Sequence, residues 1–258
     1  MDTDEMLKLL RSSTKECVAG SDTVAVAYSG GVDSAVIEKV AREFTRTICY
    51  TCAVRGSHDH GRASICAAES GVELQMITLD REMLVGLVSK ACSVLRSNDP
   101  LRVAYTIPVL CVIEASEHDV VLVGSGADEL FGGYAKYLES TDLSAAIADD
   151  IKKMQVENAM LRNYAKSIGK RMDAPFVSNE LMSFAKGLPI SRKLGQGERK
   201  IILREVARIL GVLSYDAPKK AAQYSSGVMK EMKKMAKEQD KELREWILGI
   251  GAESRRIP

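Results

Sequence analysis

Aromatic residues, cysteines and net charge are all scarce in this sequence. Aromatic side chains make up 5% of it, with a single Trp, so a base-stacking surface for nucleic acid is not expected. The six Cys are scattered, which excludes a disulfide framework and indicates a reducing, cytosolic environment. No apolar run approaches the roughly 18 residues of a membrane span. The net charge is +1, and the acidic start Met1-Asp2-Thr3-Asp4-Glu5 is unlike a signal peptide.

The sequence has the composition of a folded α/β protein. Its 258 residues are 46% hydrophobic, and short β-rich runs at 23–28, 47–54, 72–77 and 119–124 alternate with helical patterns. This alternation predicts a doubly wound parallel sheet within residues 1–140. Residues 141–258 show helical patterns only, at 142–157, 159–168, 179–186, 198–210 and 228–237. We therefore predict a core of 1–140 and an all-helical region of 141–258 that completes the substrate site, together forming one continuous unit.

A phosphate-binding loop is predicted between the first strand and the next helix. Glycines let the backbone turn its N–H groups toward an anion, and the helix adds the positive end of its dipole. Asp33 would repel a bare phosphate, so its presence indicates Mg²⁺ bridging carboxylate and phosphate oxygens. The loop consists of Ser29, Gly30, Gly31, Val32, Asp33 and Ser34.

This loop resembles the pyrophosphate loop of the ATP-pyrophosphatase superfamily, whose pattern is Ser-Gly-Gly-x-Asp-Ser. The resemblance implies the adenine nucleotide α-hydrolase-like fold, ATP and Mg²⁺ as cofactors, and cleavage of ATP into AMP and pyrophosphate. In this superfamily an oxygen of the substrate is adenylated, and a nucleophile then displaces AMP.

A second loop, residues 123–134, resembles the asparagine synthetase pattern Gly-x-Gly-x-Asp-Glu-x-Phe-Gly-Gly-Tyr. The resemblance implies that Gly124, Ser125 and Gly126 contact the nucleotide and that Asp128 is the second metal ligand, facing the pyrophosphate opposite Asp33. Glu129 either anchors a neighbouring group or caps the next turn. The resemblance covers nearly the whole chain and implies an ATP-dependent amide synthetase.

In the second half, the resemblance extends to several shorter motifs. Residues 200–204 are similar to the family's Lys-x-Ile-Leu-Arg run. The family's Glu-x-Arg-x-Pro-Phe is reversed here, with Arg171 and Asp173 before Pro175, so the two charges are expected to pair with each other. The resemblance also implies that a lysine after Pro218 stabilises charge on the phosphates, a role open to both Lys219 and Lys220.

Two departures from the family leave the acceptor open. Ser125 stands where asparagine synthetases have Glu, and a hydroxyl cannot take a proton from ammonium as a carboxylate does. The phosphate loop begins at Ser29, which leaves no room before it for a glutaminase domain. We therefore expect a small carboxylate substrate with ammonia or a substrate amine as nucleophile, and leave open a separate glutaminase and a homodimer as partners.

The runner-up is a tRNA sulphur-transfer enzyme of the same superfamily, which needs a reactive cysteine at the ATP site. Cys49 and Cys52 lie three residues apart in a predicted strand and should point to opposite faces as core thiols. Cys111 is the better placed of the remaining thiols. A third interpretation is an ATP-binding module that has lost catalysis. For any of these, Val54 and His58 at the end of the second strand should line the adenine or ribose.

Overall fold

The architecture centres on a five-stranded, fully parallel sheet. The computed structural model describes residues 2–195, 197–216 and 222–253. The strand order is β3-β2-β1-β4-β5, and β1 pairs with β2 from Thr23 opposite Arg46 to Ala27 opposite Tyr50. The predicted doubly wound α/β fold is therefore confirmed. The strands are β1 (Thr23–Ala27), β2 (Arg46–Val54), β3 (Leu74–Leu79), β4 (Val120–Leu122) and β5 (Arg171–Asp173).

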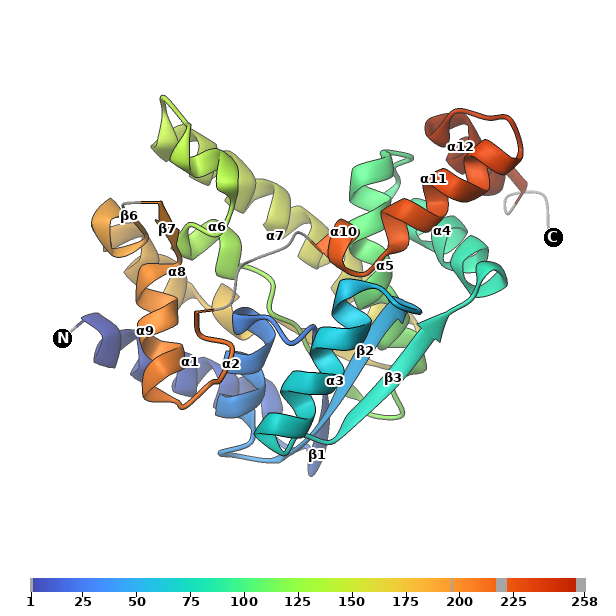
Figure 1. The fold of residues 1–258 in the computed structure, drawn as a ribbon. Coiled ribbons are helices and arrows are strands. Elements are labelled where there is room, and N and C mark those ends of the chain that lie inside the picture. Colours follow the sequence, from blue (N-terminus) through green and yellow to red (C-terminus); the bar gives the residue numbers. More distant parts are fainter. Residues whose placement is uncertain (1, 196, 217–221, 254–258) are drawn as a thin grey trace.

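One face of the sheet is covered by helices that pack around β1 and β4. Met6 of the first helix, Val36 of the second and Val26 of β1 are fully buried in this core. Figure 1 shows α1, α2 and α9 side by side on this part of the molecule. The helices of this layer are α1 (Asp2–Val18), α2 (Val32–Ala41), α3 (His58–Ser70), α6 (Ala127–Phe131), α8 (Asn179–Gly187) and α9 (Ile201–Ile209).

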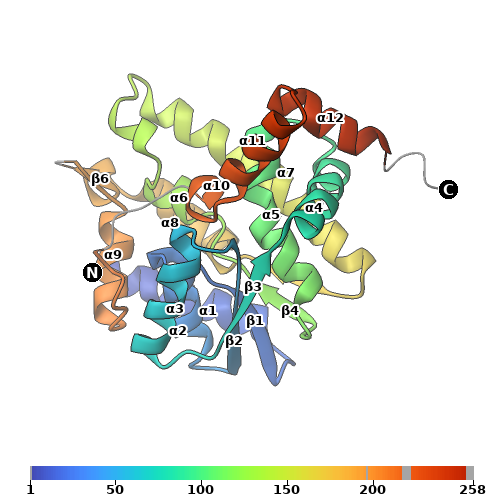
Figure 2. The ribbon, with the colours of Figure 1, turned by 45° about the vertical axis from the view of Figure 1, so that its right-hand side comes forward.

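A second core fills the opposite face. Tyr50 of β2 and Val121 of β4 point into it, because side chains alternate along a strand. Figures 1 and 2 both place the last helices of the chain beside the fourth and fifth. This layer contains α4 (Arg81–Leu95), α5 (Pro100–Ala115), α7 (Leu143–Ser167), α11 (Val228–Glu238) and α12 (Leu243–Glu253), with the short α10 (Ala222–Ser225) leading into it.

Aspartate side chains cap the first turns of α4 and α5. The side chain of Asp80 accepts a hydrogen bond from the backbone N–H of Met83 and begins α4. Asp99 caps α5 in the same way, and Pro100 occupies the first turn, where its missing N–H costs nothing. The Asn98-Asp99-Pro100 segment, whose composition suggests only a helix break, is therefore also the start of the next helix.

The second half of the chain is not all helical. β5 lies beside β4 at the edge of the sheet, with Leu122 opposite Asp173. Three residues of extended chain between helices carry too short a pattern to be recognised without the neighbouring strand. A small hairpin, β6 (Leu194–Gly195) and β7 (Glu198–Arg199), also occupies the start of the helix predicted at 198–210. The helices predicted at 142–157 and 159–168 form one continuous α7, because nothing in the sequence between them stops a helix.

Three 3-10 turns complete the described structure: η1 (Ala135–Leu138), η2 (Pro175–Val177) and η3 (Ile190–Arg192). The division into regions 1–140 and 141–258 stays a prediction, although β5 and α9 of the second region pack into the sheet and core of the first.

The connections reverse direction between β1 and β4. From β1 the chain moves outward to β2 and β3, and later from β4 to β5 on the other side. In open parallel sheets, ligands bind beyond the carboxyl ends of the strands at such a switch point. The two glycine-rich loops follow β1 and β4, so both open at this place.

Candidate active site

The loop after β1 is held in a tight turn by hydrogen bonds of its two serine side chains. The hydroxyl of Ser34 accepts from the backbone N–H of Ser29 at 3.1 Å and donates to the carbonyl of Gly31 at 3.2 Å. The hydroxyl of Ser29 accepts from the N–H of Gly31 at 3.3 Å. Gly31 is the N-cap of α2 without a side-chain cap, so the first N–H groups of that helix face the loop. The arrangement can bind an anion at the helix N-terminus.

Gly30 holds this loop against α3. Its φ of +71° lies in the left-handed region, and a Cβ there would lie 3.2 Å from the Cα of Ala63. Its carbonyl accepts from Nε of Arg62 at 3.0 Å and contacts Sγ of Cys66 at 3.6 Å. The side chain of Val32, the first residue of α2, is buried in the core, so only the backbone of Val32 is available to a ligand.

The loop after β4 touches the phosphate loop directly. A Cβ on Gly124 would lie 3.2 Å from Cβ of Asp33, which shows how closely the two loops approach. Gly126 begins α6 with a φ of +94°, and a Cβ there would lie 2.6 Å from Cγ2 of Val177. The sequence-predicted residues 29–34, 124–126 and 128 are therefore brought together at the switch point.

The centre of the site is an ion triad that joins three distant parts of the chain. Nζ of Lys200 lies 2.5 Å from Oδ1 of Asp33 and 2.6 Å from Oδ1 of Asp128. The Lys200 side chain is 2% exposed, while those of the two aspartates are 24% and 20% exposed. Burial alone would lower the pKa of Lys200, but the charges of Asp128 and Asp33 and their hydrogen bonds raise it above its ordinary value. The ammonium is therefore charged at any physiological pH.

Gly133 makes room for this triad. A Cβ at this position would lie 1.7 Å from Oδ1 of Asp128 and 2.3 Å from Cε of Lys200. No side chain can occupy that space without displacing the ion pair. The second glycine of the Gly-Gly pair is therefore required by packing against the charged groups, whereas the first, Gly132, needs its φ of +76°.

The two carboxylates fit a Mg²⁺ that is held jointly with phosphate. Among the described residues no group of three or more His, Cys, Asp or Glu could hold a metal by itself. Mg²⁺ commonly binds one or two carboxylates and completes its shell with water and substrate phosphates. Asp33 and Asp128 are partly exposed, converge on one point and suit such a site.

Ser125 is held by a buried amide. Its hydroxyl donates to Oδ1 of Asn158 on α7 at 2.9 Å, and Nδ2 of Asn158 contacts Sδ of Met154 at 3.1 Å. Asn158 is 3% exposed. Because a hydroxyl has one proton to donate, the oxygen of Ser125 offers only lone pairs to other neighbours.

Glu129 anchors the tyrosine at the end of the loop. It lies inside α6, where its carboxylate accepts from the hydroxyl of Tyr134 at 2.6 Å, and the N-cap of α6 is Gly126. Burial, together with the nearby acidic groups, raises the pKa of Tyr134. The bond ties the end of the loop back to its helix and fixes the backbone around Gly132 and Gly133.

The predicted nucleotide side of the site lies at the end of β2. Val54 donates its N–H to the carbonyl of Ser226 at 2.9 Å, and His58 begins α3. Next to it, Asp59 accepts from the hydroxyl of Ser225 at 2.8 Å and lies 3.4 Å from Nδ1 of His58. The chain after residue 221 is thereby attached to the carboxyl end of β2 and to the first turn of α3.

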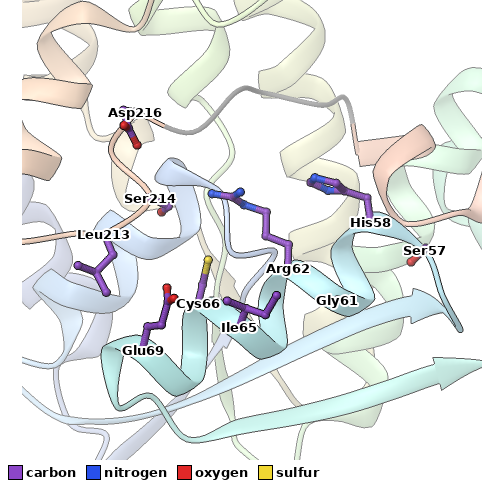
Figure 3. Close-up of a pocket in the computed structure, with 10 residues that line it drawn as sticks. All are labelled: Ser57, His58, Gly61, Arg62, Ile65, Cys66, Glu69, Leu213, Ser214 and Asp216. Atoms are coloured by element: carbon purple, nitrogen blue, oxygen red, sulfur yellow. The ribbon is translucent and has the colours of Figure 1, made fainter.

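A cavity of about 660 Å³ opens beside the phosphate loop, between α3 and residues 213–216. Figure 3 shows the side chains of His58, Arg62 and Cys66 extending from α3 toward this space, with Ser214 and Asp216 on the other side. Since Arg62 and Cys66 both contact the Gly30 carbonyl, the cavity and the phosphate loop share a wall.

The reversed charge pair is a structural contact. Nε of Arg171 lies 2.8 Å from Oδ2 of Asp173, which confirms the expected ion pair on β5. Arg171 also donates to the carbonyl of Cys17 in the last turn of α1. The pair therefore fastens the edge strand to the first helix.

The structure adds a lysine to the candidate site and leaves the two predicted lysines untested. Lys219 and Lys220 lie outside the described residues. Lys200 is the lysine that the structure places at the acidic groups, and it was not among the predicted site residues. The signal for it was present, since Lys200 begins the run that resembles the family's Lys-x-Ile-Leu-Arg.

The three cysteines considered for sulphur transfer are all buried. Cys49 and Cys52 are buried on opposite faces of β2, as predicted, and Cys111 is buried in α5. Cys66 is the thiol that contacts the phosphate loop, and burial raises its pKa, so it is protonated at neutral pH.

A doubly wound parallel sheet with a Ser-Gly-Gly-x-Asp-Ser loop at the switch point defines the pyrophosphate-loop class of α/β proteins. Within this class, the chain belongs to the asparagine synthase family, which matches residues 5–173. The match spans both glycine-rich loops and ends at β5, the last strand of the main sheet.

Curated relatives carry the same domain within longer proteins. The Methanocaldococcus jannaschii protein named "Putative asparagine synthetase (glutamine-hydrolyzing) 1" is 28% identical over 274 residues, covering 89% of this chain and 50% of the relative. The Bacillus subtilis protein named asparagine synthetase (glutamine-hydrolyzing) 1 is 33% identical over 164 residues, covering 59% of this chain and 26% of the relative. The chain thus spans half or less of the length of these relatives.

Similar solved structures are more distant. An NMN synthetase from Francisella tularensis has a TM-score of 0.47 at 14% identity, covering 98% of this chain and 92% of its own. A U34-tRNA thiolase from Methanococcus maripaludis has a TM-score of 0.43 at 14% identity, and the match covers 100% of this chain and 80% of the thiolase chain.

None of the helices in the described part of the chain has the length and apolar character needed to cross a membrane.

Proposed function

We propose that this chain joins a carboxylate to an amine at the expense of ATP, releasing AMP and pyrophosphate. The carboxylate oxygen attacks the α-phosphorus of ATP, and pyrophosphate leaves. The amine then attacks the acyl carbon of the adenylate, and AMP departs as the amide forms. The observation that carries the proposal is the meeting of Asp33, Asp128 and Lys200 directly beside the phosphate loop.

Each element of the site has a part in this chemistry. The N–H groups at the start of α2 and the hydroxyl of Ser29 bind the pyrophosphate portion, while Ser34 holds the loop in shape through its own hydrogen bonds. Asp33 and Asp128 would hold Mg²⁺, which neutralises charge on the leaving pyrophosphate when bound. Val54 and His58 line the adenine or ribose at the end of β2.

The acceptor side of the site favours an uncharged amine. Ser125 and Asn158 are neutral, and the hydroxyl oxygen of Ser125 offers lone pairs to an N–H donor. We therefore propose ammonia or an amine of the substrate as the nucleophile, with a separate glutaminase as a source of ammonia. A reducing cytosol is the compartment that the free cysteines suit.

The test is a screen for pyrophosphate and AMP release from ATP and Mg²⁺ with candidate carboxylic acids, each with and without ammonium. Equal amounts of AMP and pyrophosphate that depend on one acid support the proposal. ATP binding without AMP formation for every acid would instead favour a module that has lost catalysis. Release stimulated by tRNA and a sulphur donor, but by no acid, would favour sulphur transfer.

A further inference from the structure

Lys200 occupies the position in which a cation between the two carboxylates would lie. Its ammonium is within 2.6 Å of both Oδ1 atoms, and the triad carries one net negative charge. A pair of carboxylates without this lysine would carry two negative charges and attract a divalent ion strongly. The ammonium both repels such an ion and occupies the oxygens that would bind it.

The lysine cannot easily leave this position. Its backbone φ of 60° is left-handed, and its carbonyl accepts from the N–H of Arg204 at 2.9 Å as α9 begins. The next residue, Ile201, donates its N–H to the carbonyl of Lys193 at 3.2 Å. Gly133 backs the side chain so closely that a single added carbon would lie 2.3 Å from Cε. The ammonium is fixed by its surroundings and not by the two ion pairs alone.

We propose that Lys200 is a resident cation that prevents free divalent metal from binding to Asp33 and Asp128, so that metal enters only together with a polyphosphate. The phosphate supplies the negative charge and the oxygen ligands that the triad lacks. This inference rests on the proposed role of the two aspartates as metal ligands. It assigns to the site an order of binding, with nucleotide-bound metal as the species that is recognised.

The experiment measures Mn²⁺ binding by electron paramagnetic resonance, without nucleotide and then with pyrophosphate. The unaltered chain should bind Mn²⁺ weakly alone and at least about tenfold more tightly with pyrophosphate. Lys200→Met, which keeps the length and removes the charge, should bind Mn²⁺ alone at least about tenfold more tightly than the unaltered chain.

Lys193→Met is the matched control. Lys193 is 5% exposed and, within the described chain, its ammonium forms no ion pair, so its loss should leave Mn²⁺ binding unchanged. Thermal unfolding gives a second measurement, in which Mn²⁺ should raise the Tm of Lys200→Met but not that of the unaltered chain. Should Lys200→Met fail to fold, tight binding of Mn²⁺ by the unaltered chain alone would still overturn the inference.

Tight binding of Mn²⁺ to the unaltered chain without pyrophosphate would overturn the inference, and so would equal binding by Lys200→Met and the unaltered chain. Failure of the proposed function shows differently, as an absence of AMP and pyrophosphate in the acid screen with the unaltered chain. The two results are independent, because the metal measurement involves no turnover.

Discussion

Asp33 owes its place to the first turn of α2, where a carboxylate is also favoured by the helix dipole. Asp33→Asn keeps the size and removes the charge. We expect AMP formation to fall at least ~10²-fold, since a proposed ligand of the metal that neutralises the leaving pyrophosphate is lost. Pyrophosphate release measures this, with far-UV circular dichroism as the control for folding. Turnover equal to that of the unaltered chain would exclude a metal role for this residue.

Gly133 tests the packing of the triad without changing any charge. In Gly133→Ala the added carbon would lie 1.7 Å from Oδ1 of Asp128, so the ion pair with Lys200 must move. We expect loss of AMP formation together with a lower Tm. Gly187→Ala is the matched control, because no atom lies within 4 Å of its added Cβ and its φ is not left-handed. Full activity in Gly133→Ala would show that the triad is not needed in its observed geometry.

Ser125 tests the choice of acceptor. With Ser125 in place we expect little asparagine from aspartate, ATP and ammonium, because a group that accepts a proton is missing. Ser125→Glu should raise the rate of asparagine formation, because a general base typically accelerates a reaction by ~10²–10⁴-fold. The amide of Asn158 can turn its Nδ2 toward a new carboxylate. Ser125→Gln controls for size, and amino-acid analysis quantifies the product. Robust asparagine formation by the unaltered chain would refute the prediction.

Between elements, the attachment of α10 to α3 depends on a buried carboxyl group. Burial raises the pKa of Asp59, although hydrogen bonds from Ser225 and His58 and the charge of Arg62 act in the other direction. The folded state therefore holds the proton more tightly than the unfolded state. The stability that this gives is complete below the unfolded pKa of about 3.9 and is lost as the pH rises through the higher folded pKa.

Asp59→Asn should remove the loss of stability at higher pH, because the amide is uncharged and can still accept a hydrogen bond from Ser225. We expect a Tm at pH 7 that is higher by ~2–4 °C and a weaker dependence of Tm on pH between 4 and 7. Calorimetry across this range makes the measurement. Asp80→Asn serves as the control, since Asp80 is an exposed N-cap and Asn caps as well as Asp. A lower Tm for Asp59→Asn at pH 7 would mean that the charged form is the stabilising one.

At the scale of the whole molecule, the sheet and its two loops follow from the sequence because each rests on a local pattern. The runs at 24–28 and 120–123 are apolar, as buried parallel strands are, and each is followed by a glycine-rich loop. The strand 171–173 and the hairpin at 194–199 were missed because they are two or three residues long and exist only through their partners. Lys200 was missed because its ion pairs join residues far apart in the sequence.

The division at residue 140 can be tested by separating the two regions. A fragment of residues 1–140 would lack β5, α9 and Lys200, and it would expose core residues such as Phe131 that pack on the second region. We expect no cooperative thermal transition for this fragment. Adding residues 141–258 in equimolar amount should restore some of the signal. A fragment that unfolds cooperatively by itself would show that 1–140 is an independent domain.

The ion triad also has a consequence for synthesis of the chain on the ribosome. Asp33 lies 167 residues before Lys200 in the sequence. Asp128 is also synthesised before the lysine. At ~5–20 residues per second, Lys200 is added about 8–33 s after Asp33 and about 4–14 s after Asp128. During that interval the switch point holds two facing carboxylates that repel each other. The contact that joins the two loops through Lys200 can therefore form only after residue 200 has been made.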